Sequence, residues 1–324
     1  MRTTAAVLSL LLLAGLAAVS WAAPAGPTGP IELIAPAGAG GGWDTLCRMT
    51  ARALTAERLV TQPITVTNMP GGSGAVAIAH MVTRRKGDGN VLAAFSPALT
   101  LTIVNRNTPY TYRDVVPVAS LSTDYGVLVV RRDSAIRDLR TLAAVLRQNP
   151  GGVTVAGGSA PGSMDHIILA KWAKAAGVDP LKLRYLPFQG GGEALAAVLG
   201  GSASVLTTGA SEVIGQLEAG QVRVLGIFAE RRLGGPFAGV ATAGEQGFSV
   251  TFPIWRGFYA PPDSPTVRFW EETLVRMSQS REWAKILDEL KWFPFVLTGD
   301  RFRRFLEQDT ANFEALLKDL GFVK

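Results

Sequence analysis

Short apolar runs alternate with segments of helical periodicity along the first part of the chain. Residues 31–35 form a mostly apolar run, and residues 45–59 carry apolar side chains at helical spacing. The order then repeats, with a strand at 63–67, a helix at 75–83 and a strand at 91–95. This alternation predicts an α/β layer built on a mostly parallel sheet.

The same pattern restarts in the middle of the chain. A run rich in β-branched residues at 125–131 is followed by a helical pattern at 139–148. Further strands are expected at 153–156, 183–187, 204–207 and 223–229, with helices at 164–176 and 193–199. An apolar run at 252–260 reads as a returning strand, and the chain from 266 onward is largely helical in pattern.

This restart predicts two domains, the second inserted into the first. The mature chain of about 300 residues also exceeds what one hydrophobic core usually organises. We expect residues 23–123 and 227–324 to form the first lobe and residues 124–226 to form the second. Hinges are expected near 122–125 and 226–230.

Three glycine-rich segments each separate a predicted strand from a predicted helix. They cover residues 38–42, 157–162 and 190–192. Loops of this kind expose unpaired backbone N–H groups at the positive end of a helix dipole, which favours anions. Strand-to-helix loops of an α/β sheet share one edge, so the three predict a common cleft. Turn geometry alone explains any single one of them.

Several residues within these loops have competing interpretations. Trp43 is either a wall of a small-molecule pocket or a core aromatic residue. Asp44 is placed to cap a helix or to pair with Arg48 four residues later. His166 is expected to contact a ligand from the first turn of its helix, whereas Cys47 reads as a small buried residue.

Nucleotide binding and catalysis fit the sequence poorly. No Gly-Lys-Ser or Gly-Lys-Thr follows any glycine loop, and no acidic residue ends the strand after the first one. Ser163 with Asp165 and His166 contains the residue types of a hydrolytic triad, but adjacent helical side chains diverge. We therefore expect no catalytic residue, metal or cofactor, and a secreted hydrolase using Ser163 stays a minor alternative.

Composition and the first residues indicate export. An apolar run from 5 to 19 after Arg2, with small residues before 23, predicts a signal peptide over 1–22 that is cleaved near Ala22. Cys47 is the single cysteine of the chain, so no internal disulfide is expected. The net charge of +6 is dispersed, which favours anion capture and gives no sign of a nucleic-acid partner.

A series of short motifs resembles one known family. In order, the chain contains PAGAGGGWD, NMPGGSG, FSPALT, YGVLVVRRDS, GGSAPGSMDHI, PFQGGGEALAAVLGG and GFYAPPDSPT. This order is similar to that of the extracytoplasmic solute-binding receptors of the tripartite tricarboxylate transporter family, the Bug-type periplasmic binding proteins. The resemblance covers nearly the whole mature chain.

The resemblance implies a fold, partners and a binding site. The fold would be an α/β, type II-like, two-lobed periplasmic binding protein, with two mixed sheets flanked by helices and a ligand cleft between the lobes. Its partners would be a small carboxylate and two integral membrane transporter subunits, and the receptor itself is expected to be monomeric. Carried over position by position, the ligand-binding residues would be Gly40, Gly41, Gly42, Trp43, Asp44, Ser96, Pro97, Ser159, Gly162, Ser163, His166, Gln189, Gly190 and Gly191.

The ligand itself has two candidate classes. The form GGGWD is similar to the branch associated with citrate-like tricarboxylates and dicarboxylates. Trp43 departs from the small or polar residue common at that position, and it would also suit an aromatic or amino-acid-derived monocarboxylate. None of the loop motifs contains an arginine, so Arg48 and Arg256 are the candidates for a charged ligand contact.

Overall fold

The computed structural model describes residues 25–323, so the predicted signal peptide lies outside the described residues. Within them, no helix has both the length and the apolar character needed to cross a membrane. The strands are β1 Ile31–Ala35, β2 Ile64–Asn68, β3 Val91–Phe95, β4 Val116–Arg131, β5 Thr154–Gly157, β6 Arg184–Pro187, β7 Val205–Gly209, β8 Val222–Ile227, β9 Pro253–Ala260 and β10 Phe293–Thr298. The α-helices are α1 Gly42–Ala56, α2 Ala75–Arg84, α3 Pro97–Val104, α4 Leu139–Gln148, α5 Met164–Ala175, α6 Gly191–Leu199, α7 Ile214–Glu218, α8 Val267–Ser278, α9 Arg281–Leu290 and α10 Gly299–Asp319.

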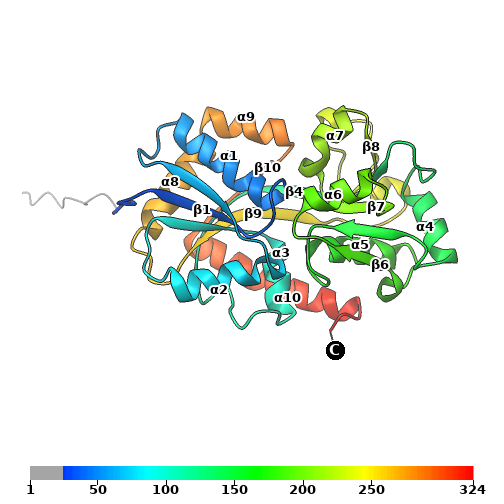
Figure 1. Cartoon of the computed structure of the whole chain (residues 1–324), viewed down its shortest axis with the longest axis horizontal. Coiled ribbons are helices and arrows are strands. Elements are labelled where there is room, and N and C mark those ends of the chain that lie inside the picture. The colour runs from blue at the N-terminus through cyan, green and yellow to red at the C-terminus, as the bar shows by residue number, and fades with distance from the viewer. Residues whose placement is uncertain (1–24, 324) are drawn as a thin grey trace, which may run out of the picture.

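The first sheet is mixed and has the strand order β2-β1-β3-β9-β4-β10. Strands β1, β2 and β3 run parallel, as expected for strands joined by crossover helices. Strand β9 is antiparallel to both of its neighbours, β3 and β4. This sheet and its helices form the left half of the molecule in Figure 1.

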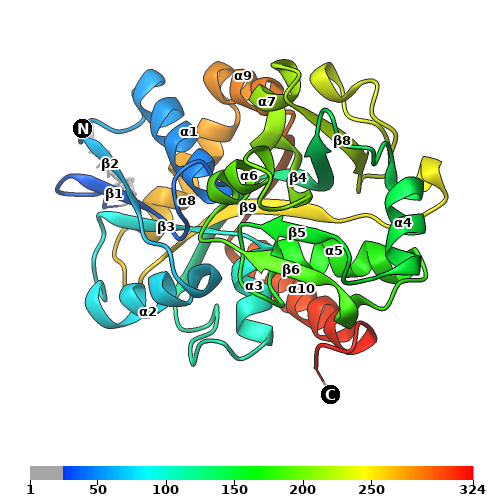
Figure 2. The same ribbon diagram turned by 45° about the vertical axis from the view of Figure 1, so that its right-hand side comes forward.

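The second sheet is also mixed and has the order β6-β5-β7-β4-β8. Strands β5, β6 and β7 are parallel, whereas β4 is antiparallel to β7 and β8. Helices α4 to α7 surround this sheet on the right of Figure 1 and remain grouped in the turned view of Figure 2. The fold is therefore the two-sheet α/β architecture that the resemblance implied.

One long strand connects the two sheets. The first part of β4, residues 116–125, pairs with β9, and the part from Gly126 to Arg131 pairs with β7 and β8. Helix α10 also spans the two halves, and it runs along the lower side of both in Figure 1. Near its end, Lys174 of α5 forms an ion pair with Asp319 at 2.5 Å.

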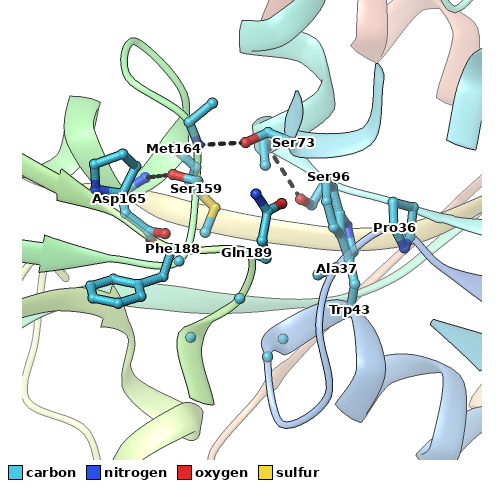
Figure 3. Close-up of a pocket in the computed structure, with 18 of the residues that line it drawn as sticks. Pro36, Ala37, Trp43, Ser73, Ser96, Ser159, Met164, Asp165, Phe188 and Gln189 are labelled. Atoms are coloured by element: carbon cyan, nitrogen blue, oxygen red, sulfur yellow. Dashed lines mark hydrogen bonds between the residues drawn. The ribbon is translucent and has the colours of Figure 1, made fainter. Parts of the chain in front are cut away.

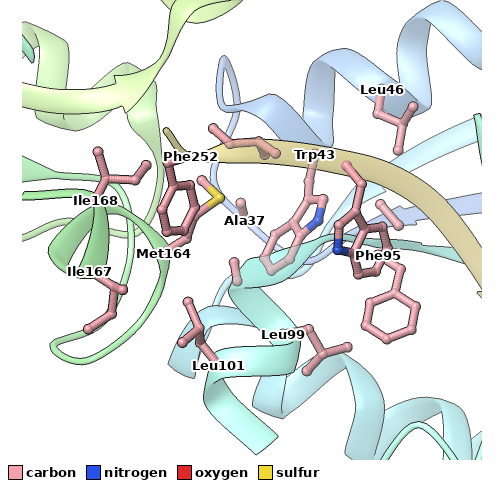
Figure 4. Packing of buried hydrophobic residues seen from close by; sticks show 14 of the residues in the cluster. Ala37, Trp43, Leu46, Phe95, Leu99, Leu101, Met164, Ile167, Ile168 and Phe252 are labelled. Atoms are coloured by element: carbon pink, nitrogen blue, oxygen red, sulfur yellow. The ribbon is translucent and has the colours of Figure 1, made fainter. Parts of the chain in front are cut away.

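The core follows the two faces of these sheets. Along β4, Leu128 and Val130 join a large cluster that extends through both halves, while Val127 and Val129 join a smaller cluster under α6. The alternation reflects the period of two in a strand, which sends successive side chains to opposite faces. Figure 4 shows the large cluster where the halves meet, with Trp43 and Leu99 near Met164 and Phe252.

The structure contains helix α7 between β7 and β8, where no helix was predicted, and it differs from the sequence prediction in three further elements. Helix α3 begins directly after Ser96, where a strand end alone was predicted. Strand β4 begins at Val116, nine residues before the predicted run, and β10 interrupts the C-terminal region that was predicted to be largely helical. Strand β10 is held by pairing with β4, and the early part of β4 pairs with both β10 and β9, so their strand character depends on distant partners.

Candidate functional site: a cavity between the two sheets

A cavity of about 230 Å³ lies where the two halves of the molecule face each other. From the first half it is lined by Pro36, Ala37, Gly41, Gly42, Trp43, Gly71, Gly72, Ser73, Ser96, Ala98 and Arg256. From the second half it is lined by Gly158, Ser159, Ala160, Pro161, Met164, Asp165, Pro187, Phe188, Gln189, Gly190, Gly191 and Glu212. Figure 3 shows Trp43, Ala37 and Pro36 on one side, Ser159, Asp165 and Phe188 on the other, and Gln189 between them.

The cavity brings together eight of the fourteen residues expected at the site, and six lie elsewhere. Those that line it are Gly41, Gly42, Trp43, Ser96, Ser159, Gln189, Gly190 and Gly191. Those outside the lining are Gly40, Asp44, Pro97, Gly162, Ser163 and His166. Gly40, Asp44 and Pro97 each adjoin an expected residue that lines the cavity. Gly162, Ser163 and His166 follow the lining loop around Ser159 or lie in the first turn of α5.

The Asp44 carboxylate holds the first glycine loop, residues 38–42, in place through hydrogen bonds. Its carboxylate accepts hydrogen bonds from the backbone N–H of Gly40 at 3.0 Å, from Asn68 at 3.0 Å and from the Arg48 guanidinium at 3.0 Å. Burial opposes ionisation of Asp44, but these bonds outweigh it and hold the pKa of the carboxyl below its usual value. Gly40 has a φ of 78°, a left-handed conformation that suits glycine.

Three helices begin at the cavity: α1 and α6 have no side-chain cap, whereas in α5 the Asp165 N–H donates to Ser159 Oγ at 2.9 Å. Helix α1 follows Gly41, α5 follows Ser163 and α6 follows Gly190, and no side chain of these capping residues accepts from the first turn. By contrast, Ser96 caps α3 by accepting from the N–H of Ala98 at 3.3 Å. Uncapped N-termini present backbone N–H donors and a partial positive charge, so the cavity is suited to an anionic group.

The two halves are in direct contact across the cavity. The Gly38 N–H donates to the Gln189 carbonyl oxygen at 2.8 Å, and the Ala160 N–H donates to Ser73 Oγ at 2.7 Å. A Cβ placed on Gly192 would approach the Ala39 carbonyl oxygen to 2.8 Å, which is closer than such contacts occur. The cleft is closed in this structure, and glycine allows the opposing loops to approach this closely.

Behind the glycine loops lies a buried group of charged side chains. Arg256 on β9 is 1% exposed and donates to the Asp124 carboxylate at 2.8 Å. Its guanidinium also lies 3.9 Å from Glu212 and 4.9 Å from the centre of the Trp292 ring. A Cβ on Gly42 would meet Arg256 Nη1 at 2.1 Å, so glycine at position 42 makes room for the guanidinium beneath α1.

Similarity to known proteins identifies the family of this chain. The sequence matches the tripartite tricarboxylate transporter family receptor over residues 47–322. The chain belongs to this family. The description of the family is that of a receptor of tripartite tricarboxylate transporters.

Relatives of the receptor share its full length. A UPF0065 protein of Cupriavidus necator is 27% identical over 304 residues, which cover 92% of this chain and 89% of the relative. The Rhodopseudomonas palustris protein Rpa4515, solved with adipate, has a TM-score of 0.83 at 23% identity and covers 91% of this chain and 98% of its own. MatC of the same organism, solved with malate, has a TM-score of 0.77 at 23% identity and covers 90% and 99%.

In the receptor, Ser163 and His166 have separate partners. Ser163 Oγ donates to the Ala98 carbonyl oxygen at 3.0 Å and thereby links the two halves. His166 Nδ1 accepts from the Gly162 N–H at 3.0 Å, and the ring stacks on Tyr185 with centroids 4.4 Å apart. Burial lowers the pKa of His166 to about 4, so the ring is neutral at pH 7.

Sequence reasoning missed several residues of the receptor's cavity. Arg256 was one of two arginine candidates, and the structure places it at the cavity, whereas Arg48 is half exposed and paired with Asp44. Asp165 was considered as a member of a hydrolytic triad and not as a ligand contact, and Glu212 carried no motif at all. Ser73 lies in the quoted NMPGGSG motif, and its φ of 50° is an unusual backbone conformation for a non-glycine residue.

Within residues 25–323, no group of three or more His, Cys, Asp or Glu side chains is arranged to hold a metal ion.

Proposed function

We propose that this receptor closes over a small carboxylate and delivers it to a tripartite transporter with two integral membrane subunits. The observation that carries the proposal is the convergence of three helix N-termini, two of them without a side-chain cap, on one cavity between the two sheets. Backbone N–H groups near Gly41, Gly42 and Trp43 would bind one carboxylate of the ligand. The modest positive charge of the chain favours capture of anions.

Two ligand classes are compatible with this role. A citrate-like tricarboxylate or dicarboxylate is supported by the GGGWD motif and by the malate and adipate held by MatC and Rpa4515. An aromatic or amino-acid-derived monocarboxylate is favoured by Trp43, which lines the cavity and is 7% exposed. The indole Nε1 of Trp43 is buried and has no hydrogen-bond partner among residues 25–323.

We propose a binding role without bond making or breaking. The hydroxyl of Ser163 is engaged with a backbone carbonyl of the other half, and His166 is neutral and engaged with Gly162. A nucleophile and its base need to share a hydrogen bond, and this pair has different partners. The contacts of both residues instead support a role in holding the closed cleft.

The lobes and their hinges are also part of the proposal. The sequence pattern predicted a first lobe of residues 23–123 and 227–324 and a second lobe of residues 124–226; we propose instead that the second lobe extends over residues 124–252 and the first lobe resumes at 253, with β4 crossing near Asp124. The segment after β8 stays hydrogen-bonded to the second sheet, because Phe228 N–H donates to Gly126 at 2.9 Å and Phe252 N–H donates to Phe228 at 2.7 Å. These bonds support a return crossing at Phe252 and Pro253 in place of one at 226–227.

The proposal also includes export of the chain and its interaction with the membrane subunits. The segment 1–22 would direct the chain to the periplasm and be removed near Ala22. The mature receptor would act as a monomer that presents its closed, loaded form to the membrane subunits. Ligand binding stabilises closure because the ligand contacts loops of both lobes.

A thermal-shift screen of the refolded mature protein tests this function. The panel contains citrate, other dicarboxylates and tricarboxylates, aromatic acids and amino acids. A ligand at 100 times its dissociation constant adds about 2.7 kcal/mol to the free energy of unfolding, which raises the melting temperature by roughly 4 °C in a protein of this size. A folded protein whose melting temperature responds to no acid would rule out a carboxylate receptor.

A further inference from the structure

The cavity contains more carboxyl groups than cationic groups. Asp124, Asp165 and Glu212 surround a single guanidinium, that of Arg256. All four side chains are buried, and three of them line the cavity, namely Asp165, Glu212 and Arg256. A site built only for a polyanion would be expected to have the opposite balance of charge.

The Arg256 guanidinium already forms a hydrogen-bonded ion pair with Asp124. Asp124 Oδ2 accepts from Arg256 Nη2 at 2.8 Å and from Ser211 Oγ at 2.6 Å, while Oδ1 accepts from the Tyr125 N–H at 2.7 Å. Glu212 lies farther from the guanidinium, at 3.9 Å. Two carboxyl groups, those of Asp165 and Glu212, are therefore left without a cation in hydrogen-bond contact.

Asp165 has an unused acceptor. The residue is 4% exposed, lines the cavity beside Ser159 and Phe188 in Figure 3, and its Oδ1 has no hydrogen-bond partner among the described residues. Burial, reinforced by the nearby Glu212, raises the pKa of Asp165 to about 8. Burial likewise raises the pKa of Glu212. Both groups therefore favour a proton or a cation beside them.

Two residues of the cavity lining each have a buried polar atom without a hydrogen-bond partner among the described residues, and the two atoms have opposite requirements. Trp43 Nε1 is a buried donor without a partner, and it needs an acceptor such as a carboxylate oxygen. Asp165 Oδ1 is a buried acceptor without a partner, and it needs a donor. A ligand that satisfies both has a carboxylate at one end and a donor group at the other.

We propose that the ligand carries a protonated amino group together with its carboxylate, and that Asp165 and Glu212 form the subsite for the amino group. This inference rests on the proposed carboxylate-receptor function and narrows its substrate class to amino acids or their close derivatives. The carboxylate lies against the N-termini of α1 and α6, and the ammonium takes the place of the proton that Asp165 holds in the empty cavity. An ammonium is preferred over a hydroxyl because it compensates the surplus negative charge as well as the unused acceptor.

Sets of acids that differ at one substituent test this subsite. The first set is L-aspartate, L-malate and succinate, the second is L-glutamate, 2-hydroxyglutarate and glutarate, and the third is L-phenylalanine, 3-phenyllactate and 3-phenylpropionate. Each set places an ammonium, a hydroxyl or a hydrogen on the same carbon. Dissociation constants are measured by calorimetry on the refolded mature protein at pH 7.

Three variants connect the preference to the proposed residues. Asp165→Asn and Glu212→Gln each remove one carboxyl charge of the subsite while keeping its size. Asp309→Asn is the matched control, because Asp309 is a largely buried carboxyl on α10 that accepts from Trp255 Nε1 at 3.0 Å and does not line the cavity. Thermal unfolding confirms that each variant is folded, and having two subsite variants allows for the failure of one.

The expected result is at least a tenfold preference for the amino acid over both analogues in each set that binds. This preference should fall to threefold or less in Asp165→Asn or Glu212→Gln and persist in Asp309→Asn. A hydroxy acid or an unsubstituted acid that binds as tightly as its amino counterpart would overturn the subsite while leaving the carboxylate receptor intact. If no acid of any set binds to the folded wild type, the receptor function fails, and the inference fails with it.

Discussion

Arg256 and Asp124 form a buried ion pair of 2.8 Å at the point where β4 leaves the first sheet for the second. Arg256 belongs to β9 of the first sheet, whereas Asp124 lies at the crossing itself. The side chains are 2% and 0% exposed. The pair thus connects the floor of the cavity to the proposed hinge.

Removing one partner of this pair should destabilise the receptor. In Arg256→Met, the Asp124 carboxylate remains buried without its cation, and we expect the free energy of unfolding to fall by about 3–5 kcal/mol. Urea denaturation measures the change. The double variant Arg256→Met with Asp124→Leu should recover much of the loss, and a double variant no more stable than the single one would contradict this account.

Closure should depend on the small size of residue 192. In Gly192→Ala, the added methyl would stand 2.8 Å from the Ala39 carbonyl oxygen of the opposite half. We expect ligand affinity to fall roughly tenfold, about 1.4 kcal/mol, because the clash exists only when the cleft is closed. The stability of the ligand-free protein should not fall, since alanine favours the first turn of α6.

Gly215→Ala is the control for this substitution. Position 215 lies in α7, and a Cβ there has no atom within 4 Å. Calorimetry with whichever acid binds the wild type should show unchanged affinity for Gly215→Ala. Equal affinities for the two alanine variants would show that the contact between the loops does not limit closure.

His166 should make the receptor sensitive to mild acid. Its pKa is lowered to about 4 by burial, so below about pH 6.5 the unfolded chain binds a proton that the folded chain does not. The contribution of His166 to stability is therefore complete above pH 6.5 and is lost as the pH falls, by about 3 kcal/mol at pH 4. His166→Asn should show a correspondingly weaker fall in stability between pH 6.5 and pH 4.

The other histidine of the chain provides the control. His80 lies on α2 and is partly exposed, and His80→Asn should retain the acid sensitivity of the wild type. Unfolding midpoints in urea at half-unit steps of pH separate the two variants. If His166→Asn follows the wild type over the whole range, burial of this ring does not cause the acid sensitivity.

In the ligand-free receptor, the stability contributed by Asp165 should fall as the pH rises, whereas that contributed by His166 falls as the pH drops. Its pKa is raised to about 8, so between about pH 4 and pH 8 the folded chain holds a proton that the unfolded chain releases. Stability from this group is present at low pH and is lost as the pH rises through that window. Asp165→Asn should become progressively more stable relative to the wild type from pH 5 to pH 8, whereas Asp309→Asn should show a smaller change that ends near pH 6.

The prediction for Asp165 is measured by the same urea titrations without any ligand. A difference between Asp165→Asn and wild type that stays constant with pH would mean that the carboxyl is ionised in the empty cavity. That result would remove the proton that the ligand ammonium is proposed to replace.

Local patterns in the sequence were sufficient for the α/β class, and the resemblance carried by the motifs implied the two-sheet fold. Apolar periodicity located β1, α1, β3, α4 and β9 closely, because a strand or helix that packs on a core must repeat its apolar positions every two or 3.6 residues. The glycine loops were also visible, since a close approach of backbones requires residues without a side chain. The order of these motifs identified the receptor family.

Contacts between residues far apart in the sequence determined two strands and the buried charged group, which local patterns did not predict. The early half of β4 and all of β10 are strands because each is paired with a partner far along the chain. Arg256, Asp124 and Glu212 have no shared motif, and they meet because β9 lies against β4 while the turn after β7 packs beneath both. Charge balance in a cavity depends on which side chains the fold brings within a few ångströms, and no local pattern records that.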